Sequence, residues 1–183
     1  MIYLDNAATT KISNNALKIY NKYAEELFYN PSAIYACGVK VKQDIESARQ
    51  TILKALGGEF DNFVFTSSAT ESNNLAILGS VRSNFKKVIL SKADHPSTYN
   101  VGLELEKRGI SVDYCPLMPN GEIDYDALES MLDENVSLIS VIHVSNETGA
   151  INDLKRINEL RNKYCKNAIF HADGVQAFSK INS

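Results

Sequence analysis

The sequence predicts an α/β protein with a mostly parallel β-sheet that helices cover on both faces. Two observations support this prediction. Short apolar strands alternate with helical patterns along most of the chain, the order that strand–helix–strand units produce. The strand expected at Leu138–Val144 is largely apolar instead of alternating, as in a strand that is buried on both faces.

The first part of the chain is predicted to be helical. Ser13 is a suitable N-cap for a helix that reaches about Tyr29. Pro31 ends this helix, and an irregular loop follows through Gly38. A long amphipathic helix then runs to about Leu56, where a Gly-Gly pair stops it.

Strands and helices alternate in the rest of the chain, with apolar runs bounded by polar turns. Five strands are expected at about 62–66, 88–90, 111–115, 138–144 and 168–172. Helices are expected at about 71–82, 97–107, from Asp124, and at 153–164.

Composition excludes several classes of protein. A net charge of −3 with scattered Lys and Arg argues against a nucleic-acid partner. Cys37, Cys115 and Cys165 are too few and too widely spaced for a disulfide framework or a zinc site, so no metal is expected. The first residues lack the layout of a signal peptide, and the longest apolar run is too short for a membrane span. A cytoplasmic protein without a membrane partner is therefore expected.

Ligands of such a sheet bind beyond the carboxyl ends of its strands, so the polar residues there are the candidates for a site. After the first strand, five of the seven residues from Thr66 to Ser72 carry hydroxyl groups and open a helix. Free N–H groups, hydroxyl donors and the helix dipole suit a phosphate. The alternative is an ordinary helix cap with solvated Asn residues.

Two further strand ends also carry polar residues. Pro96 restricts His95 to an extended backbone, so its ring is expected to project and either stack on a flat ligand, move protons or cap the next helix. Asn146 offers a donor and an acceptor after the most apolar strand, although Asn and Gly in this segment also suit a turn.

The last strand leads into Asp173 and Gln176. A buried carboxylate costs several kcal/mol to desolvate unless a cation meets it, and a pyridinium ring held as an electron sink is such a cation. The alternative is that Asp173 caps a short final helix. His171 is expected to be a packed core histidine and not a ligand.

Five motifs resemble the cysteine desulfurases, a family of pyridoxal-phosphate enzymes in the class V aminotransferase group. They occur in the family's order and spacing along the whole chain. The motifs are Tyr3-Leu4-Asp5-Asn6-Ala7-Ala8-Thr9-Thr10, Asn30-Pro31-Ser32, Phe65-Thr66-Ser67-Ser68-Ala69-Thr70-Glu71-Ser72-Asn73-Asn74, Asn146-Glu147-Thr148-Gly149 and His171-Ala172-Asp173-Gly174-Val175-Gln176-Ala177.

The resemblance implies the cofactor pyridoxal 5'-phosphate and a role for several residues. Ala69 and Thr70 would bind the phosphate. His95 would stack on the pyridine ring and act as the catalytic proton carrier. Asn146 would lie between the phenolic oxygen of the cofactor and the substrate carboxylate.

Two residues after the last strand complete the implied site. Asp173 would pair with the ring nitrogen, and Gln176 would hydrogen-bond the phenolic oxygen. The implied substrate is L-cysteine, which gives alanine and an enzyme persulfide for iron–sulfur cluster assembly or other sulfur transfer. The implied partners are a second copy in a homodimer and a scaffold or sulfur-acceptor protein.

The implied fold is the three-layer αβα large domain of fold-type I pyridoxal-phosphate enzymes, truncated before its last strands and the small domain. Residues 1–15 are expected to form an N-terminal arm and residues 16–183 a partial large domain. By resemblance, the strand at Phe63–Phe65 would lack its neighbour.

The sequence departs from the family at its end. The Ser-x-His-Lys segment that carries the Schiff-base lysine and the sulfur-accepting cysteine are not present. The isolated chain is therefore expected to be inactive. Two alternatives remain: a selenocysteine lyase or another class V aminotransferase, and a non-catalytic remnant or interaction module.

Overall fold

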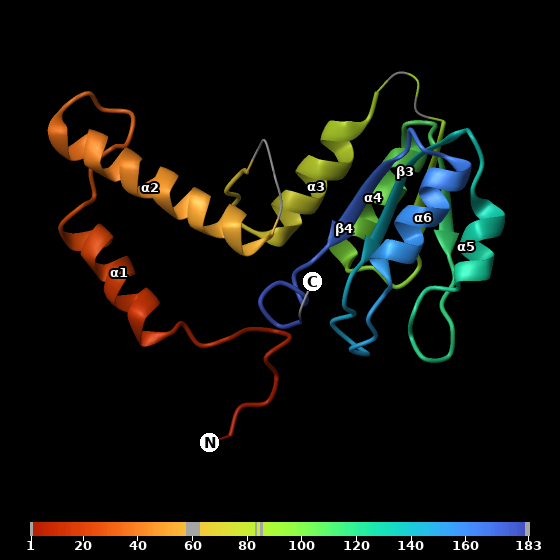
Figure 1. Ribbon diagram of the computed structural model, residues 1–183, viewed down its shortest axis with the longest axis horizontal. Helices are drawn as coiled ribbons and strands as arrows, with labels where there is room; N and C mark the ends of the chain where they lie inside the picture. The colour runs from red at the N-terminus through yellow and green to blue at the C-terminus, as the bar shows by residue number, and fades with distance from the viewer. Residues whose placement is uncertain (1, 58–62, 83, 85, 182–183) are drawn as a thin grey trace. The chain divides into compact units, whose positions relative to one another are not determined.

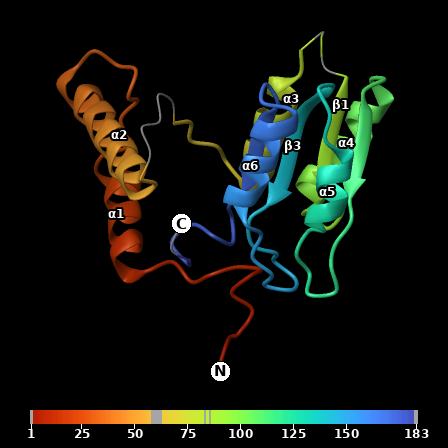
Figure 2. The same ribbon diagram turned by 45° about the vertical axis from the view of Figure 1, so that its right-hand side comes forward.

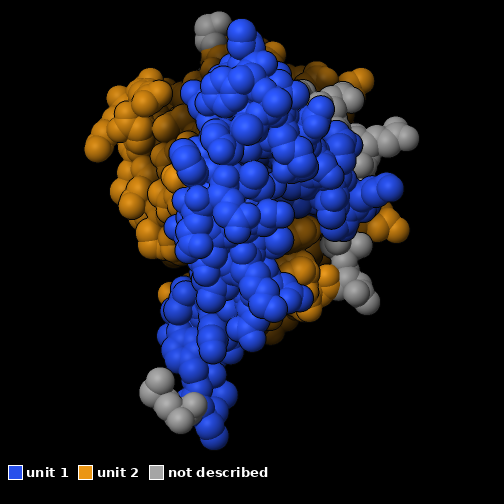
Figure 3. Space-filling model, turned by 90° about the vertical axis from the view of Figure 1, so that its left-hand side faces the viewer, with its two compact units in different colours: residues 1–65 blue, residues 66–183 orange. Residues whose placement is uncertain are grey.

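A computed structural model describes residues 2–57, 63–82, 84 and 86–181 (Figure 1). The chain divides into two compact units, Met1–Phe65 and Thr66–Ser183, which Figure 3 colours separately. The predicted division into an arm at 1–15 and a partial domain at 16–183 stays a prediction.

Unit 1 contains two helices, α1 (Asn14–Glu25) and α2 (Ala36–Ala55). The predicted cap is confirmed, because the Ser13 hydroxyl accepts from the Ala16 N–H of α1 at 3.2 Å. A hydrogen bond of 2.8 Å from the Tyr23 hydroxyl to Asp44 Oδ2 joins the two helices. The long second helix is also confirmed, and it ends before Gly57, whose φ of 67° favours glycine.

The strand expected at 62–66 is wrong for the residues that the structure describes. Residues 63–66 form no strand, and residue 62 lies outside the described residues. The Phe63 carbonyl instead accepts a hydrogen bond from the Arg49 guanidinium, and the Phe63 and Phe65 rings pack edge to face at 4.9 Å. A strand exists only by pairing with a neighbour, and an apolar pattern cannot supply that neighbour.

Unit 2 contains a four-stranded parallel sheet with the strand order β2-β1-β3-β4 (Figure 2). Its strands are β1 (Lys87–Ser91), β2 (Ser111–Cys115), β3 (Val136–Ile142) and β4 (Ile169–Asp173). Its helices are α3 (Ala69–Ser80), α4 (Pro96–Lys107), α5 (Tyr125–Met131) and α6 (Leu154–Tyr164). The four later predicted strands and the four predicted helices are confirmed within a few residues, with Asp124 and Asp153 as the N-caps of α5 and α6.

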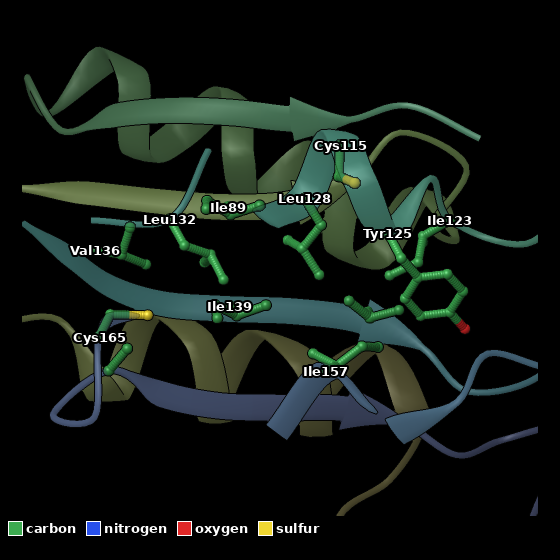
Figure 4. Close-up of a cluster of buried hydrophobic side chains, with 12 residues drawn as sticks. Ile89, Cys115, Ile123, Tyr125, Leu128, Leu132, Val136, Ile139, Ile157 and Cys165 are labelled. Atoms are coloured by element: carbon green, nitrogen blue, oxygen red, sulfur yellow. The ribbon is translucent and has the colours of Figure 1, made fainter. Parts of the chain in front are cut away.

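Helices cover both faces of this sheet and make three layers. On one face, Ile77 of α3 and Leu105 of α4 pack against Val88, Leu90 and Leu138. On the other face, Leu128 of α5 and Ile157 of α6 pack against Ile89 and Ile139 (Figure 4). Successive strand residues point to opposite faces, so adjacent apolar residues supply both cores. The predicted α/β fold with a sheet covered on both faces is confirmed.

The strand order defines where a ligand site is expected. The connection after β1 leads through α4 to β2 on one side, whereas the connection after β2 leads through α5 to β3 on the other side of β1. The carboxyl ends of β1 and β3 therefore meet at a topological switch point, the usual ligand position in open α/β sheets. No helix in the described part of the chain is long and apolar enough to cross a membrane.

Candidate cofactor site

The switch point brings Asp94 and Asp173 to the same end of the sheet. Asp94 follows β1, and its Oδ1 accepts a hydrogen bond of 2.9 Å from the N–H of Ile142, the last residue of β3. Asp173 ends β4, and its backbone carbonyl accepts at 2.9 Å from the His143 N–H just beyond β3. The Asp94 side chain and the Asp173 backbone are thus both held by residues at the carboxyl end of β3.

Asp173 is buried, with 5% of its surface exposed. Its Oδ1 accepts from the Val175 N–H at 3.0 Å, and its Oδ2 accepts from the Asn73 amide at 2.8 Å. Asp173 accepts from the backbone as a cap would, but the short final helix that it was expected to cap is absent, because residues 175–180 form turns. Both partners are neutral and Asp173 makes no ion pair with any described residue, so the carboxylate keeps its capacity for a cationic ligand.

A chain of hydrogen bonds connects Asp173 to His95. The Asn73 amide of α3 donates to Asp173 Oδ2 and, at 2.9 Å, to Ser97 Oγ of α4. Ser97 Oγ lies 2.8 Å from His95 Nδ1. Asn73 and Ser97 are both buried, so the interpretation of the Asn residues of this motif as solvated is wrong for Asn73.

His95 is exposed at the start of α4. Its Nδ1 accepts from the Ser97 backbone N–H at 3.1 Å, so the capping role that the sequence left open is confirmed. Capping occupies only Nδ1 and leaves the ring face and Nε2 available. The predicted stacking and proton-transfer roles of His95 are compatible with this geometry and stay predictions.

The amino end of α3 presents unpaired backbone donors. Ser68 is its N-cap and accepts from the Glu71 N–H, while Glu71 Oε2 accepts from the Ser67 N–H and hydroxyl at 2.7 and 2.5 Å. The Ala69 and Thr70 N–H groups make no hydrogen bond within the described residues. Unpaired N–H groups at the positive end of a helix fit a phosphate.

Asn146 and Gln176, the other two predicted site residues, are both half-buried. Asn146 lies in the turn after β3, and its side chain makes no hydrogen bond to the described part of the chain. Gln176 Oε1 accepts from the Lys180 ammonium at 2.5 Å. Asn146 follows β3 and Gln176 follows β4, and their predicted contacts with the cofactor stay predictions.

Burial changes the protonation of two neighbouring groups. Desolvation raises the pKa of Asp94 to about 7, the hydrogen bond from the Ile142 N–H opposes this rise, and the negative charge of Asp173 adds to it. Desolvation lowers the pKa of His171, whose Nδ1 lies 2.8 Å from the Ser140 hydroxyl. His171 is half-buried on β4 and bonded to the neighbouring strand, as expected of a structural histidine.

Two polar hollows of about 430 and 550 Å³ lie at the amino ends of the strands, away from the predicted site residues. Val136, the first residue of β3, lines both hollows, and Ile169, the first residue of β4, lines the larger one. Ligand sites of parallel sheets lie at the opposite ends. Among the described residues, no group of three or more His, Cys, Asp or Glu side chains could hold a metal ion.

The three layers, with polar side chains at the carboxyl ends of the strands, define an α/β protein with a candidate ligand site there. Comparison with known families identifies the group. The family model Aminotransferase class-V matches residues 2–183, and the chain belongs to this family. The predicted class V aminotransferase group is therefore confirmed.

Known proteins are similar over the whole chain. This chain is 37% identical over 183 residues to a NifS/IcsS protein homolog of Lactobacillus delbrueckii subsp. bulgaricus, and the match covers 98% of this chain and 47% of that relative. It is 36% identical over 183 residues to the cysteine desulfurase IscS of Dictyoglomus turgidum, covering 98% of this chain and 46% of that relative. The chain thus spans about half the length of the curated relatives it matches.

Solved structures agree with the predicted fold class. A NifS-like protein superposes with a TM-score of 0.95 at 28% identity, over 98% of this chain and 50% of that chain. The structure of SspA in complex with cysteine gives a TM-score of 0.90 at 32% identity, over 97% of this chain and 52% of that chain. The described sheet is therefore part of the large domain of fold-type I proteins.

Proposed function

We propose that this chain forms the cofactor-binding part of a cysteine desulfurase that uses pyridoxal 5'-phosphate. Asp173 is the observation on which the proposal rests. A carboxylate that is 5% exposed and has only neutral hydrogen-bond partners lacks the charge compensation that buried ions require. A protonated pyridine nitrogen would supply that compensation at the strand end where ligands of this fold class bind.

The donor set at the switch point fits the other groups of the cofactor. The Ala69 and Thr70 N–H groups would hold the phosphate at the amino end of α3. The exposed ring of His95 would stack on the pyridine. Asn146 and Gln176 would bind the phenolic oxygen and orient the substrate carboxylate.

Asp173 and His95 would then have separate roles in the reaction. When bound, the cofactor supplies an electron sink for bonds broken at the amino acid. Asp173 would keep the ring nitrogen protonated, because its negative charge favours the N–H form. His95 would exchange protons through Nε2, since Nδ1 is occupied as the cap of α4.

L-cysteine is the proposed substrate. The relatives named cysteine desulfurase and the cysteine complex of SspA support this choice. The products would be alanine and sulfur for iron–sulfur cluster assembly or other transfer, with a scaffold or acceptor protein as partner. A homodimer and a cytoplasmic location complete the proposal.

Two of the three cysteines of this chain are unsuited to accept the sulfur. Burial raises the pKa of the Cys115 thiol to about 12, and it also raises the pKa of Cys165. The thiolate is the nucleophile, so a buried thiol with a raised pKa is inert. Cys37 is exposed at the start of α2 and lies in unit 1.

This chain alone is expected to be inactive, so the proposed activity is tested in a protein that completes it with a Schiff-base lysine and an acceptor cysteine. Alanine release from L-cysteine is measured there with pyridoxal phosphate and a thiol reductant. Alanine production that requires the cofactor would support the desulfurase. Alanine from selenocysteine alone would identify a selenocysteine lyase. Cofactor binding without either reaction would leave another class V activity, and no cofactor binding would leave an interaction module.

A further inference from the structure

Asn73, Ser97 and His95 form a directional set of hydrogen bonds, which we call the Asn73–Ser97 relay. Its donors and acceptors can be assigned one after another, beginning with the Asp173 carboxylate. A carboxylate oxygen accepts and does not donate, so the group of Asn73 that faces Asp173 Oδ2 at 2.8 Å must be its NH₂. The second N–H of this amide points to Ser97 Oγ at 2.9 Å.

The direction continues through Ser97. Its oxygen already accepts from Asn73, so its single hydrogen is available to donate. The acceptor within reach is His95 Nδ1, at 2.8 Å. The backbone N–H of Ser97 also points to Nδ1, at 3.1 Å, and a backbone N–H can only donate.

Two donors therefore converge on His95 Nδ1, which must be the unprotonated nitrogen of the neutral ring. We propose that Asn73 and Ser97 are positioning residues that hold His95 in the tautomer with its hydrogen on Nε2. In this tautomer the outer edge of the ring offers an N–H donor to a bound ligand. Neutral His95 therefore presents a hydrogen-bond donor at Nε2 and has no lone pair there with which to act as a base.

The burial of the relay favours this account. Asn73 is 4% exposed and Ser97 is 7% exposed, so water competes little for either group. Hydrogen bonds in series polarise one another in such an environment. A change at Asn73 is therefore expected to alter His95, although the two residues share no hydrogen bond.

The nitrogen resonances of His95 test the proposal. Long-range ¹H–¹⁵N spectra of the cofactor-free protein with ¹⁵N-labelled histidine report which ring nitrogen carries the hydrogen. The chain has three histidines, so one His95→Gln variant assigns the signal. The expected result is a hydrogen on Nε2 and a hydrogen-bonded Nδ1, whereas a hydrogen on Nδ1 would overturn the proposal.

Variants separate the relay from a merely structural role. Ser97→Ala and Asn73→Ala are both expected to move the His95 Nδ1 resonance toward the value of an unbonded nitrogen, and Ser97→Thr is expected to restore it. Thr98→Val is the matched control, because Thr98 is also buried in α4 and its hydroxyl has no hydrogen-bond partner among the described residues. If Ser97→Ala moves the resonance no further than Thr98→Val does, the relay is refuted, even where Asn73→Ala does not fold.

The meaning of this tautomer for catalysis rests on the proposed function, but its measurement does not. The spectra are recorded without cofactor. A confirmed tautomer with no binding of pyridoxal phosphate would retain the relay and reject the cofactor site. Binding of pyridoxal phosphate together with a hydrogen on Nδ1 would retain the cofactor site and reject the relay.

Discussion

Asp94 and Asp173 are buried carboxylates at the same end of the sheet, and only one of them has both oxygens hydrogen-bonded. Asp173 accepts from Asn73 and Val175, whereas Asp94 accepts from Ile142 through Oδ1 and leaves Oδ2 without a partner among the described residues. An unpaired buried oxygen favours the protonated acid. Asp94 is therefore suited to the neutral state, whereas both oxygens of Asp173 already accept hydrogen bonds.

Asp94 is expected to make the protein less stable as the pH rises. Its pKa is raised to about 7 from 3.8, so between these values the folded protein holds a proton that the unfolded chain has lost. Its contribution favours folding at the acid end of this range and is lost as the pH rises through about 7. Asp94→Asn keeps an acceptor for Ile142 and should raise the free energy of unfolding above pH 7 by on the order of a few kcal/mol.

Urea unfolding at a series of pH values measures this difference. The stability gain of Asp94→Asn over the wild type should grow from about pH 4 to pH 7 and then stay constant. Asp126→Asn, at a side chain that is 96% exposed, makes the same chemical change as a control. Parallel curves for the wild type and Asp94→Asn would contradict the assignment of a neutral Asp94.

Ala69→Pro is expected to weaken phosphate binding without unfolding α3. Ala69 is the first residue of the helix, where proline is tolerated, and Ser68 before it has the extended backbone that proline requires. The substitution removes one N–H donor from the proposed phosphate site. A hydrogen bond to a charged group contributes about 1.5–3 kcal/mol, so the affinity for pyridoxal phosphate should fall by about tenfold or more.

The same variant should bind pyridoxal as the wild type does, because this ligand lacks the phosphate. Calorimetric titration with both ligands makes the comparison, and far-ultraviolet circular dichroism checks that the helix is retained. An equal loss for both ligands would mean that the phosphate does not lie at the amino end of α3.

Gly102→Ala is expected to destabilise unit 2, although alanine favours helices. A Cβ at Gly102 of α4 would lie 2.6 Å from Leu90 Cδ1 and 2.7 Å from the Tyr114 hydroxyl oxygen. Overpacking of this kind typically costs about 1–3 kcal/mol. At Gly79 of α3 no atom of the described residues lies within 4 Å of such a Cβ, so Gly79→Ala should stabilise by about 0.5–1 kcal/mol.

Thermal unfolding of both glycine variants tests the packing of α4 on the sheet. Opposite changes in the melting temperature are expected. A similar rise for both variants would mean that α4 lies farther from β1 and β2 than described.

Local chemistry made most of the fold predictable. Ser13, Asp124 and Asp153 were predicted to begin helices, and each accepts a hydrogen bond from the first turn of its helix. These contacts span only two or three residues, so the sequence pattern contains them. The strand expected at 62–66 was wrong for the described residues 63–66, because a strand depends on a neighbour that its own residues do not specify.

The candidate site was predictable only where its residues follow strands. His95, Asn146 and Asp173 stand at strand ends, which is the signal that identified them. Asn73 and Ser97 lie inside helices, and Asn73 reaches Asp173 across 100 positions of the chain. A polar residue within a helix has no local pattern that distinguishes burial from solvation, so both were missed as members of the site.

Calorimetric titration with pyridoxine 5'-phosphate is the most direct test of the proposed cofactor site. This ligand carries the ring and the phosphate but lacks the aldehyde, so it cannot react with lysine and reports only the non-covalent site. The wild type should bind it, and Asp173→Asn should bind at least about tenfold more weakly, because the amide cannot compensate the ring charge. Equal affinity in the wild type and Asp173→Asn, or no binding to the folded wild type, would contradict the account.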